Sequence, residues 1–190
     1  MTVAFRTTLL LTLVITGIIS TAEGSRIYLK AILAQYLLET AWRNIQNGVH
    51  KLRPWPWADT WPVAELSSPH HNERMIVLAG ATGRTLAFGP AHLLASADPG
   101  EIGNTVLLGH RDTHFAFLKH LQPNDLLQLK STDGTQHFYR VSETTVVHES
   151  KVDVMAPSND KRLTLITCFP FDALIPGGPL RYVVHAIASE

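Results

Sequence analysis

The sequence predicts a mostly β protein: a closed β-barrel with short helices, preceded by an N-terminal membrane helix and an amphipathic helix. Three observations lead to this fold class. Short β-prone runs separated by turn signals fill the chain after residue 74. The N-terminal part instead begins with an uncharged apolar run, and helical periodicity follows that run. Many short strands with few helical segments are typical of closed barrels, and a long uncharged apolar run is typical of a membrane helix.

The first element is an apolar segment from Thr7 to Ala22 that follows Arg6 and carries no charge. Its 16 residues span about 24 Å as a helix, less than the ~30 Å hydrocarbon core of a bilayer. Counting from Val3, with the Arg6 side chain reaching back to the interface, gives about twenty residues, enough to span. Ser20-Thr21-Ala22 resembles the end of a cleavable signal peptide, so cleavage is the alternative. We expect residues 1–26 to be a retained anchor.

The second element, residues 27–52, has the periodicity of an amphipathic helix. Its apolar residues recur at three- and four-residue spacing: Ala34, Leu37, Leu38, Ala41, Trp42 and Ile45. Periodicity alone does not tell a protein surface from a lipid surface. A helix packed on the following domain and an interfacial helix that continues the anchor therefore stay open as alternatives.

Residues 53–73 are expected to form a linker. The segment carries four prolines, Pro54, Pro56, Pro62 and Pro69, with tryptophans between them. Such a composition is typical of a stiff, extended connection. We expect the tryptophans to pack this connection onto the next domain.

The remaining residues, 74–190, are expected to form the barrel. The β-prone runs are Met75–Ala79, Thr85–Phe88, Asn104–Leu108, Asp125–Lys130, Gln136–Val147, Arg162–Cys168 and Arg181–Ile187. Asp133-Gly134 is a hairpin turn signal, and a short helical piece is expected near His114 to Leu121.

Composition narrows the functional classes. Lys and Arg together number 16, as do Asp and Glu, so the net charge is near zero. No basic field is available for nucleic acid. The single cysteine, Cys168, forms no disulfide within the chain. It ends a β-prone run and precedes Phe169-Pro170, where a strand gives way to a loop. A thiol held there is either a buried small hydrophobe or a reactive group.

Two further strand ends carry groups that suit thiol chemistry. His110 follows the apolar run that ends at Leu108, and Arg181 enters the last β-prone run. An imidazole can donate and accept a proton near neutral pH, and a guanidinium can stabilise an oxyanion. Cysteine-based acyl transfer is therefore the favoured chemistry. The rival side chains are His114 for the histidine, and Arg111 and Arg84 for the arginine.

These residues carry a resemblance to a known family. Thr164-Leu165-Ile166-Thr167-Cys168 resembles the Thr-Leu-x-Thr-Cys signature of sortases, the cysteine transpeptidases. His110 and Arg181 match the family's histidine and arginine in chain order, and the likeness extends from about Arg74 to Ala188. The compact catalytic region is most similar to class D/E-like sortases and those of Gram-negative bacteria.

The resemblance implies a sortase-type barrel and a reaction. A member of this family cleaves an LPXTG-like sorting signal at the C-terminal end of an exported protein, holds the acyl group as a thioester on Cys168, and passes it to an amine acceptor. His110 and Arg181 complete the catalytic set, and Thr164 and Thr167 would bind the substrate beside the peptide groove or support that groove. Apart from the resemblance, His92 is expected to bind the substrate at its rim, with a structural role as the alternative. The implied location is the cytoplasmic membrane, single-pass, with the catalytic domain on the extracytoplasmic side.

Several alternatives remain beside this interpretation. An exported cysteine peptidase would use water as the acceptor, and a non-enzymatic anchored β-domain would hold an inert thiol. A peptidoglycan L,D-transpeptidase is a weaker alternative, because the Ser-x-Gly-Cys pattern of that class is absent around Cys168. We expect no cofactor and no metal. His70 and His71 lack a third ligand at a recognisable spacing, and the acidic residues before the cysteine strand show no ordered calcium-ligand pattern.

Overall fold

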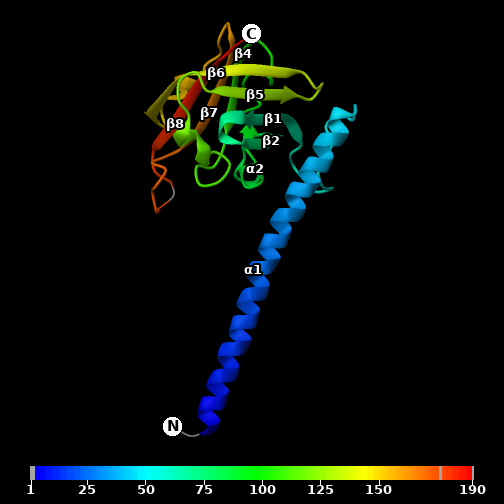
Figure 1. Cartoon of the computed structure of the whole chain (residues 1–190), viewed down its shortest axis with the longest axis vertical. Helices are drawn as coiled ribbons and strands as arrows, with labels where there is room; N and C mark the ends of the chain where they lie inside the picture. Colours follow the sequence, from blue (N-terminus) through cyan, green and yellow to red (C-terminus); the bar gives the residue numbers. More distant parts are fainter. Residues whose placement is uncertain (1–2, 176, 190) are drawn as a thin grey trace. The chain divides into compact units, whose positions relative to one another are not determined.

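The structure, a computed structural model, describes residues 3–175 and 177–189. Its main feature is a closed barrel with the strand order β1-β2-β3-β4-β7-β8-β6-β5, preceded by one long helix, α1 (Val3–Gln46) (Figure 1). The predicted fold class, a mostly β closed barrel after an N-terminal helix, is confirmed. The chain divides between Leu37 and Leu38 into two compact units, so that the last turns of α1 belong to the barrel unit.

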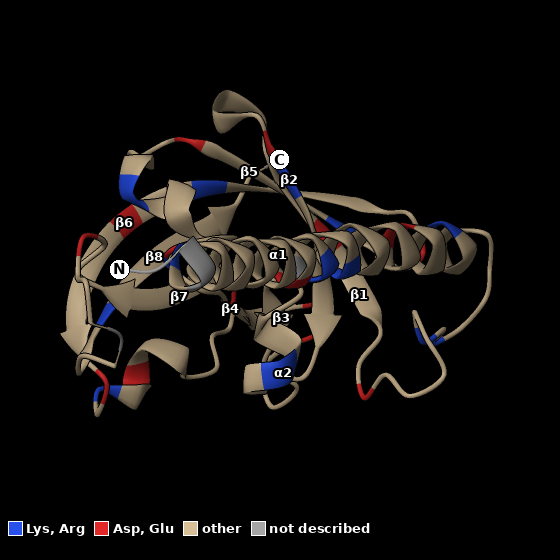
Figure 2. Cartoon of the chain, turned by 90° about the horizontal axis from the view of Figure 1, so that it is seen from below, with Lys and Arg blue, Asp and Glu red and all other residues tan. Residues whose placement is uncertain are grey.

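The barrel strands are β1 (Pro62–Ser68), β2 (Glu73–Ala79), β3 (Ala91–His92), β4 (Gly103–Leu108), β5 (Leu126–Ser131), β6 (Gln136–His148), β7 (Lys161–Phe169) and β8 (Leu180–Ala188). The short helices are α2 (Gly83–Leu86) and the 3-10 helices η1 (Pro69–His71), η2 (Ala116–His120) and η3 (Val152–Met155). Lys and Arg are interspersed with Asp and Glu over the barrel (Figure 2).

The pairing of β4, β7 and β8 decides where the functional strand ends lie. β4 and β7 are parallel, with Leu108 opposite Ile166. β7 and β8 are antiparallel, with Cys168 opposite Arg181. Parallel neighbours need a long crossover connection, which β5 and β6 supply between β4 and β7. The end of β4, the end of β7 and the start of β8 therefore lie together at one end of the barrel.

The barrel interior is filled by alternate strand residues. Leu127 and Leu129 of β5 and Leu163 and Leu165 of β7 are fully buried in one cluster with Tyr139. This alternation is the period of two that a strand with one face on the core requires. A second cluster covers the outer face of β7 and holds Val106, Ile166 and Val183, with Val154 and Met155 packed against them. β7 is consequently buried on both faces from Leu163 to Thr167.

Helix α1 is continuous through residues 26 and 27, where the sequence suggested two separate elements. Because no Pro or Gly interrupts residues 25 to 46, the helical pattern has no reason to break there. From Phe5 onward the helix is long and apolar enough to cross a membrane, and a signal sequence near an N-terminus meets the same requirements.

The last turns of α1 pack on the barrel through apolar and polar contacts. Leu38, Trp42 and Ile45 are buried in a cluster with Ile76 and Leu78 of β2. The apolar face formed by Leu38, Trp42 and Ile45 therefore packs on the barrel, as in the first of the two alternatives, and not on lipid.

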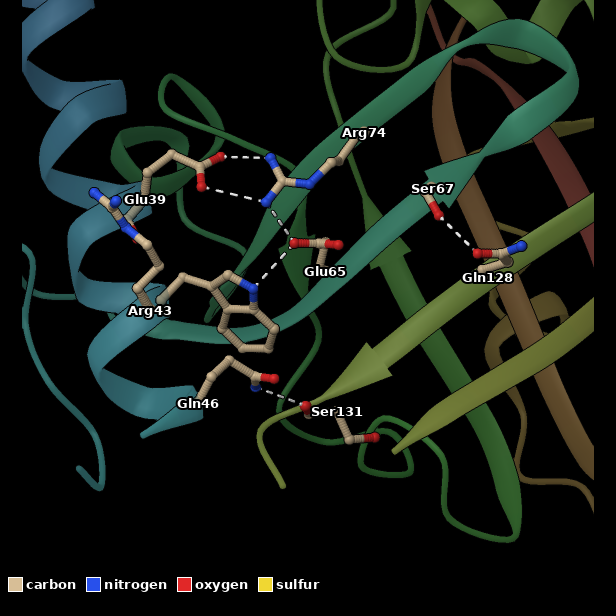
Figure 3. Close-up of polar contacts among 9 residues, drawn as sticks. Glu39, Arg43, Gln46, Glu65, Ser67, Arg74, Gln128 and Ser131 are labelled. Atoms are coloured by element: carbon tan, nitrogen blue, oxygen red, sulfur yellow. Dashed lines mark hydrogen bonds and ion pairs between the residues drawn. The ribbon is translucent and has the colours of Figure 1, made fainter. Parts of the chain in front are cut away.

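A polar network borders this apolar contact (Figure 3). Arg74 donates two hydrogen bonds to the carboxylate of Glu39, at 2.8 and 3.2 Å, and one to Glu65 at 2.6 Å. The Trp42 indole donates to the same Glu65 carboxylate at 3.0 Å. The hydrogen bond to Glu39 is the main reason that the pKa of Arg74 is raised. Gln46 donates to the Ser131 carbonyl oxygen at 3.0 Å, which ties the end of α1 to the end of β5.

Three local expectations differ from the structure. β1 (Pro62–Ser68) lies inside the segment expected to be a linker, because a proline is tolerated as the first residue of a strand. The run Thr85–Phe88 was expected to be a strand, but α2 (Gly83–Leu86) occupies its start. The Thr82 side chain accepts a hydrogen bond from the Thr85 amide, an N-cap that favours a helical turn. The two-residue strand β3 was not predicted.

Candidate active site

Cys168 lies near the end of β7 and is partly exposed, whereas the five residues before it are buried. It lines a cavity of about 280 Å³ together with His110 and Arg181. The expected strand end is thus displaced by one residue, since β7 continues to Phe169. A strand that is buried on both faces fixes the backbone of Cys168, and the cavity gives its thiol access.

His110 is brought to the thiol by the parallel register. Leu108 lies opposite Ile166, and the Gly109 amide donates to the Ile166 carbonyl oxygen at 3.1 Å. Continuing this register by two residues places His110 beside Cys168. Gly109 is required by packing, because a Cβ atom there would lie 2.6 Å from the ring of the buried Phe115. The imidazole itself is exposed toward the cavity that it lines.

Arg181 approaches the thiol from the other neighbouring strand, directly opposite Cys168. Its Nη1 group donates to the carbonyl oxygens of Gly178 and Leu180, at 2.6 and 2.9 Å, and its Nη2 group donates to Glu149. Among the described residues these bonds use three of the five guanidinium N–H donors. The side chain is therefore held in place and keeps donors for an incoming oxygen.

The cavity wall is largely apolar, and its rim is polar. The apolar lining residues are Leu86, Leu108, Val147, Val154, Met155, Ile166 and Val183. His148, Glu149 and Lys151 lie at the end of β6 and just beyond it, and they supply polar groups. An apolar wall beside polar catalytic groups is the usual construction of a small-ligand or peptide site.

The two rival side chains in the segment after β4 do not line this cavity. His114 is partly buried, and its pKa is lowered, first by that burial and then by the charge of His110. Arg111 is buried and bonds to the loop after Cys168. His110 and Arg181 were preferred to these rivals in the sequence analysis, and the cavity contains the preferred pair.

The expected substrate-contacting residues have different surroundings. Thr164 is fully buried, donates to Asn104 Oδ1 at 2.7 Å and contacts His185 Nδ1 at 3.0 Å. His92 is 1% exposed and bonds to the Ala97 carbonyl oxygen at 2.9 Å. Neither residue lines the cavity at Cys168, and the polar groups of both side chains bond to other residues of the barrel domain. Thr167 does line the cavity, but its hydroxyl donates to the Gly109 carbonyl oxygen at 2.7 Å.

Potential metal ligands are not gathered in the described part of the chain, where no group of three or more His, Cys, Asp or Glu side chains could hold an ion. His71, one of the paired histidines, instead contacts the Ser68 hydroxyl through Nδ1 at 3.2 Å. Its Nε2 atom lies 4.0 Å from Asp125. These contacts tie the turn between β1 and β2 to the start of β5.

Comparisons with known proteins show the family of this chain. The sortase domain model matches residues 66–189. Sortase D of Bacillus subtilis (strain 168) is 31% identical over 121 residues, a match that covers 63% of this chain and 60% of that protein. The chain therefore belongs to the sortase family, and class D-like sortases are among its relatives.

Solved structures show the same fold. Sortase A from Corynebacterium diphtheriae superposes with a TM-score of 0.64 at 25% identity, covering 83% of this chain and 84% of that one. A sortase D5 transpeptidase from Clostridium perfringens superposes with a TM-score of 0.62 at 22% identity, covering 80% and 89% respectively.

Proposed function

We propose that this chain is a membrane-anchored cysteine transpeptidase that cleaves an LPXTG-like sorting signal and transfers the acyl group to an amine. The observation that carries the proposal is the strand register. It places Cys168 directly opposite Arg181 and beside His110, on one cavity with an apolar wall. A thiol, an imidazole and a guanidinium in this arrangement supply the nucleophile, the proton carrier and the oxyanion donor that acyl transfer needs.

In the first half-reaction the Cys168 thiolate attacks the carbonyl carbon of the Thr–Gly peptide bond in the signal. A bond forms between Sγ and that carbon, and the negative charge moves to the carbonyl oxygen. The N–H donors of Arg181 that Gly178, Leu180 and Glu149 leave available point to a role in binding this oxyanion. His110 gives its proton to the departing amine as the C–N bond breaks, which leaves a thioester on Cys168.

In the second half-reaction an amine nitrogen attacks the thioester carbon. His110 removes a proton from the incoming amine, the C–S bond breaks, and the Cys168 thiolate and the protonated imidazole are regenerated. The net change is the exchange of one amide bond for another. The apolar side of the cavity, formed in part by Val154 and Met155, favours the apolar side chains of a sorting signal and limits water at the thioester.

The anchor completes the proposal. Helix α1 has the length and composition of a membrane span, and we assign its N-terminus, with Arg6, to the cytoplasmic side. The barrel unit would then lie outside the cytoplasm, where exported proteins with C-terminal sorting signals are available as substrates. The sorting signal, the amine acceptor and the membrane are the partners that this function requires.

The test is a product assay on sorting-signal peptides with the full chain in detergent micelles, with and without an added amine. We expect an acyl-enzyme on Cys168, seen as a mass increase, and an amide product when amine is present. Cys168→Ala should form neither while keeping the fold. Peptide cleavage at near wild-type rate by this variant would refute the mechanism. Cleavage that no amine diverts would assign the chain to peptidases that use water.

A further inference from the structure

The two residues that flank His110 are bonded to segments on either side of Cys168. On one side, the Thr167 hydroxyl donates to the Gly109 carbonyl oxygen at 2.7 Å. On the other side, Arg111 donates to the carbonyl oxygens of Pro170 and Ala173, which lie in the loop after β7, at 2.6 and 2.7 Å. His110 therefore lies between two anchored neighbours, and Cys168 lies between the two segments that they bind.

Arg111 is a charged residue in a buried position. Its side chain is 5% exposed, and its third bond, from Nε, reaches Asp112 at 3.1 Å, whose carboxylate is 65% exposed. Burying a guanidinium is costly unless its donors are satisfied. Here the planar fork binds two carbonyl oxygens of one loop at once, a geometry that the single ammonium of a lysine does not reproduce. Arg111 does not line the cavity, so any effect on the reaction passes through other residues.

We propose that Arg111 is a positioning residue that, with Thr167, fixes the His110 imidazole relative to the Cys168 thiol. The segment after β4 and the loop after β7 are far apart in sequence, and the ladder between β4 and β7 ends at Leu108 and Ile166. Beyond that point the hydrogen bonds of Gly109, Thr167 and Arg111 hold the two segments together. A misplacement of about 1 Å between reacting groups can lower a rate by about a hundredfold, so these bonds bear directly on turnover. The proposal rests on the proposed function only in taking His110 and Cys168 as the reacting pair.

The experiment uses the thiol itself as the probe, because Cys168 is the only cysteine of the chain. The full chain in detergent micelles is alkylated with iodoacetamide at about pH 7, and the rate is read by mass spectrometry. Four proteins form a double-mutant cycle: wild type, Arg111→Met, His110→Ala and the double variant. We expect each single variant to alkylate at least about threefold more slowly. The double variant should match His110→Ala within about twofold, since Arg111 acts through His110.

Turnover of a sorting-signal peptide provides the second measurement. Arg111→Met should lower kcat by at least about tenfold while KM changes by less than about threefold. Arg111→Lys should recover only part of this loss, because it donates to one carbonyl oxygen and not to two. Arg140→Met is the matched control: Arg140 also donates to a carbonyl oxygen, that of Asn124 at 3.0 Å, but lies away from the cavity. It should change neither measurement.

An unchanged alkylation rate in Arg111→Met would overturn the proposal, as would independent, multiplicative effects of the two substitutions. If Arg111→Met does not fold, Thr167→Val takes its place, because it removes only the hydroxyl bond to Gly109. This variant should also alkylate more slowly than wild type, and an unchanged alkylation rate would overturn the proposal. Failure of the proposed function gives a different result. A wild-type chain that cleaves no sorting peptide would refute the transpeptidase assignment and leave the alkylation cycle to judge Arg111.

Discussion

Replacing Trp42 by alanine tests whether the end of helix α1 is part of the barrel's structure. Trp42 is 2% exposed, packs in the cluster with Leu38 and Ile45, and donates to Glu65. Truncating a buried tryptophan costs about 3–5 kcal/mol through lost apolar burial and the cavity left behind. The lost indole bond adds about 1 kcal/mol, although Arg74 remains as a partner for Glu65. We expect Trp42→Ala to lower the free energy of unfolding by about 4 kcal/mol.

Two further variants separate the contributions. Trp42→Phe keeps most of the apolar contact and loses the indole N–H, so its cost should be about 1–2 kcal/mol. Trp57→Ala is the control, because Trp57 is 83% exposed and its truncation should stay within about 0.5 kcal/mol. The measurement is urea unfolding of the full chain in micelles, followed by far-UV circular dichroism of the β signal. A Trp42→Ala cost no greater than that of Trp57→Ala would show that the last turns of α1 do not stabilise the barrel.

Three further predictions address the site and the interior. His110→Ala should lose nearly all peptide turnover because the leaving amine lacks its acid, whereas His114→Ala should keep at least about a tenth of it, a barrier change below about 1.4 kcal/mol; the reverse order would exchange their roles. Burial lowers the pKa of His185, so the unfolded chain binds this proton at higher pH than the folded chain does. Stability should therefore fall as the pH drops below about 6.5, and His185→Gln should weaken that fall. The measurement is the denaturation midpoint of both proteins at about pH 8 and about pH 5.5. An equal fall of the midpoint in wild type and His185→Gln would contradict the prediction. Tyr139→Phe should not destabilise the fold and should raise the free energy of unfolding by up to about 1 kcal/mol, because the buried hydroxyl has no partner among the described residues; a loss above about 1 kcal/mol in urea unfolding would contradict this.

The strands that carry the site could be predicted because their sequence signals are local. β4 is an apolar run ended by Gly109, and β7 is a β-prone run followed by Pro170, so both ends were placed within one residue. The proline in the first position of β1 instead led to a wrong prediction. Within a proline-rich stretch it indicated a linker, and only the pairing of β1 with β2 and β5 shows that the segment belongs to the barrel.

The surroundings of individual side chains could not be predicted in the same way. Thr164 was expected at the substrate because it belongs to the signature around Cys168. In the structure it is buried beneath a second apolar layer on the outer face of β7 and bonds to Asn104 and His185. That layer comes partly from Val154 in the loop between β6 and β7, which approaches only after folding. Alternation along one strand says which residues share a face, but it does not say what covers that face.

In the proposed mechanism, the spatial order of the strands explains why the nucleophile lies on β7 rather than on either neighbour. Cys168 and Arg181 lie on β7 and β8, and His110 lies two residues after the end of β4; these three strands are adjacent in the order β4, β7, β8. A central strand lets one thiol meet a proton carrier on one side and an oxyanion donor on the other, whereas a thiol on β4 would have Arg181 two strands away. Neighbouring strands lie about 4.8 Å apart, so a displacement by one strand exceeds the reach of a direct hydrogen bond. The crossover through β5 and β6, which makes β4 and β7 parallel, thus brings together three residues distant in sequence, as the proposed reaction at one carbonyl group requires.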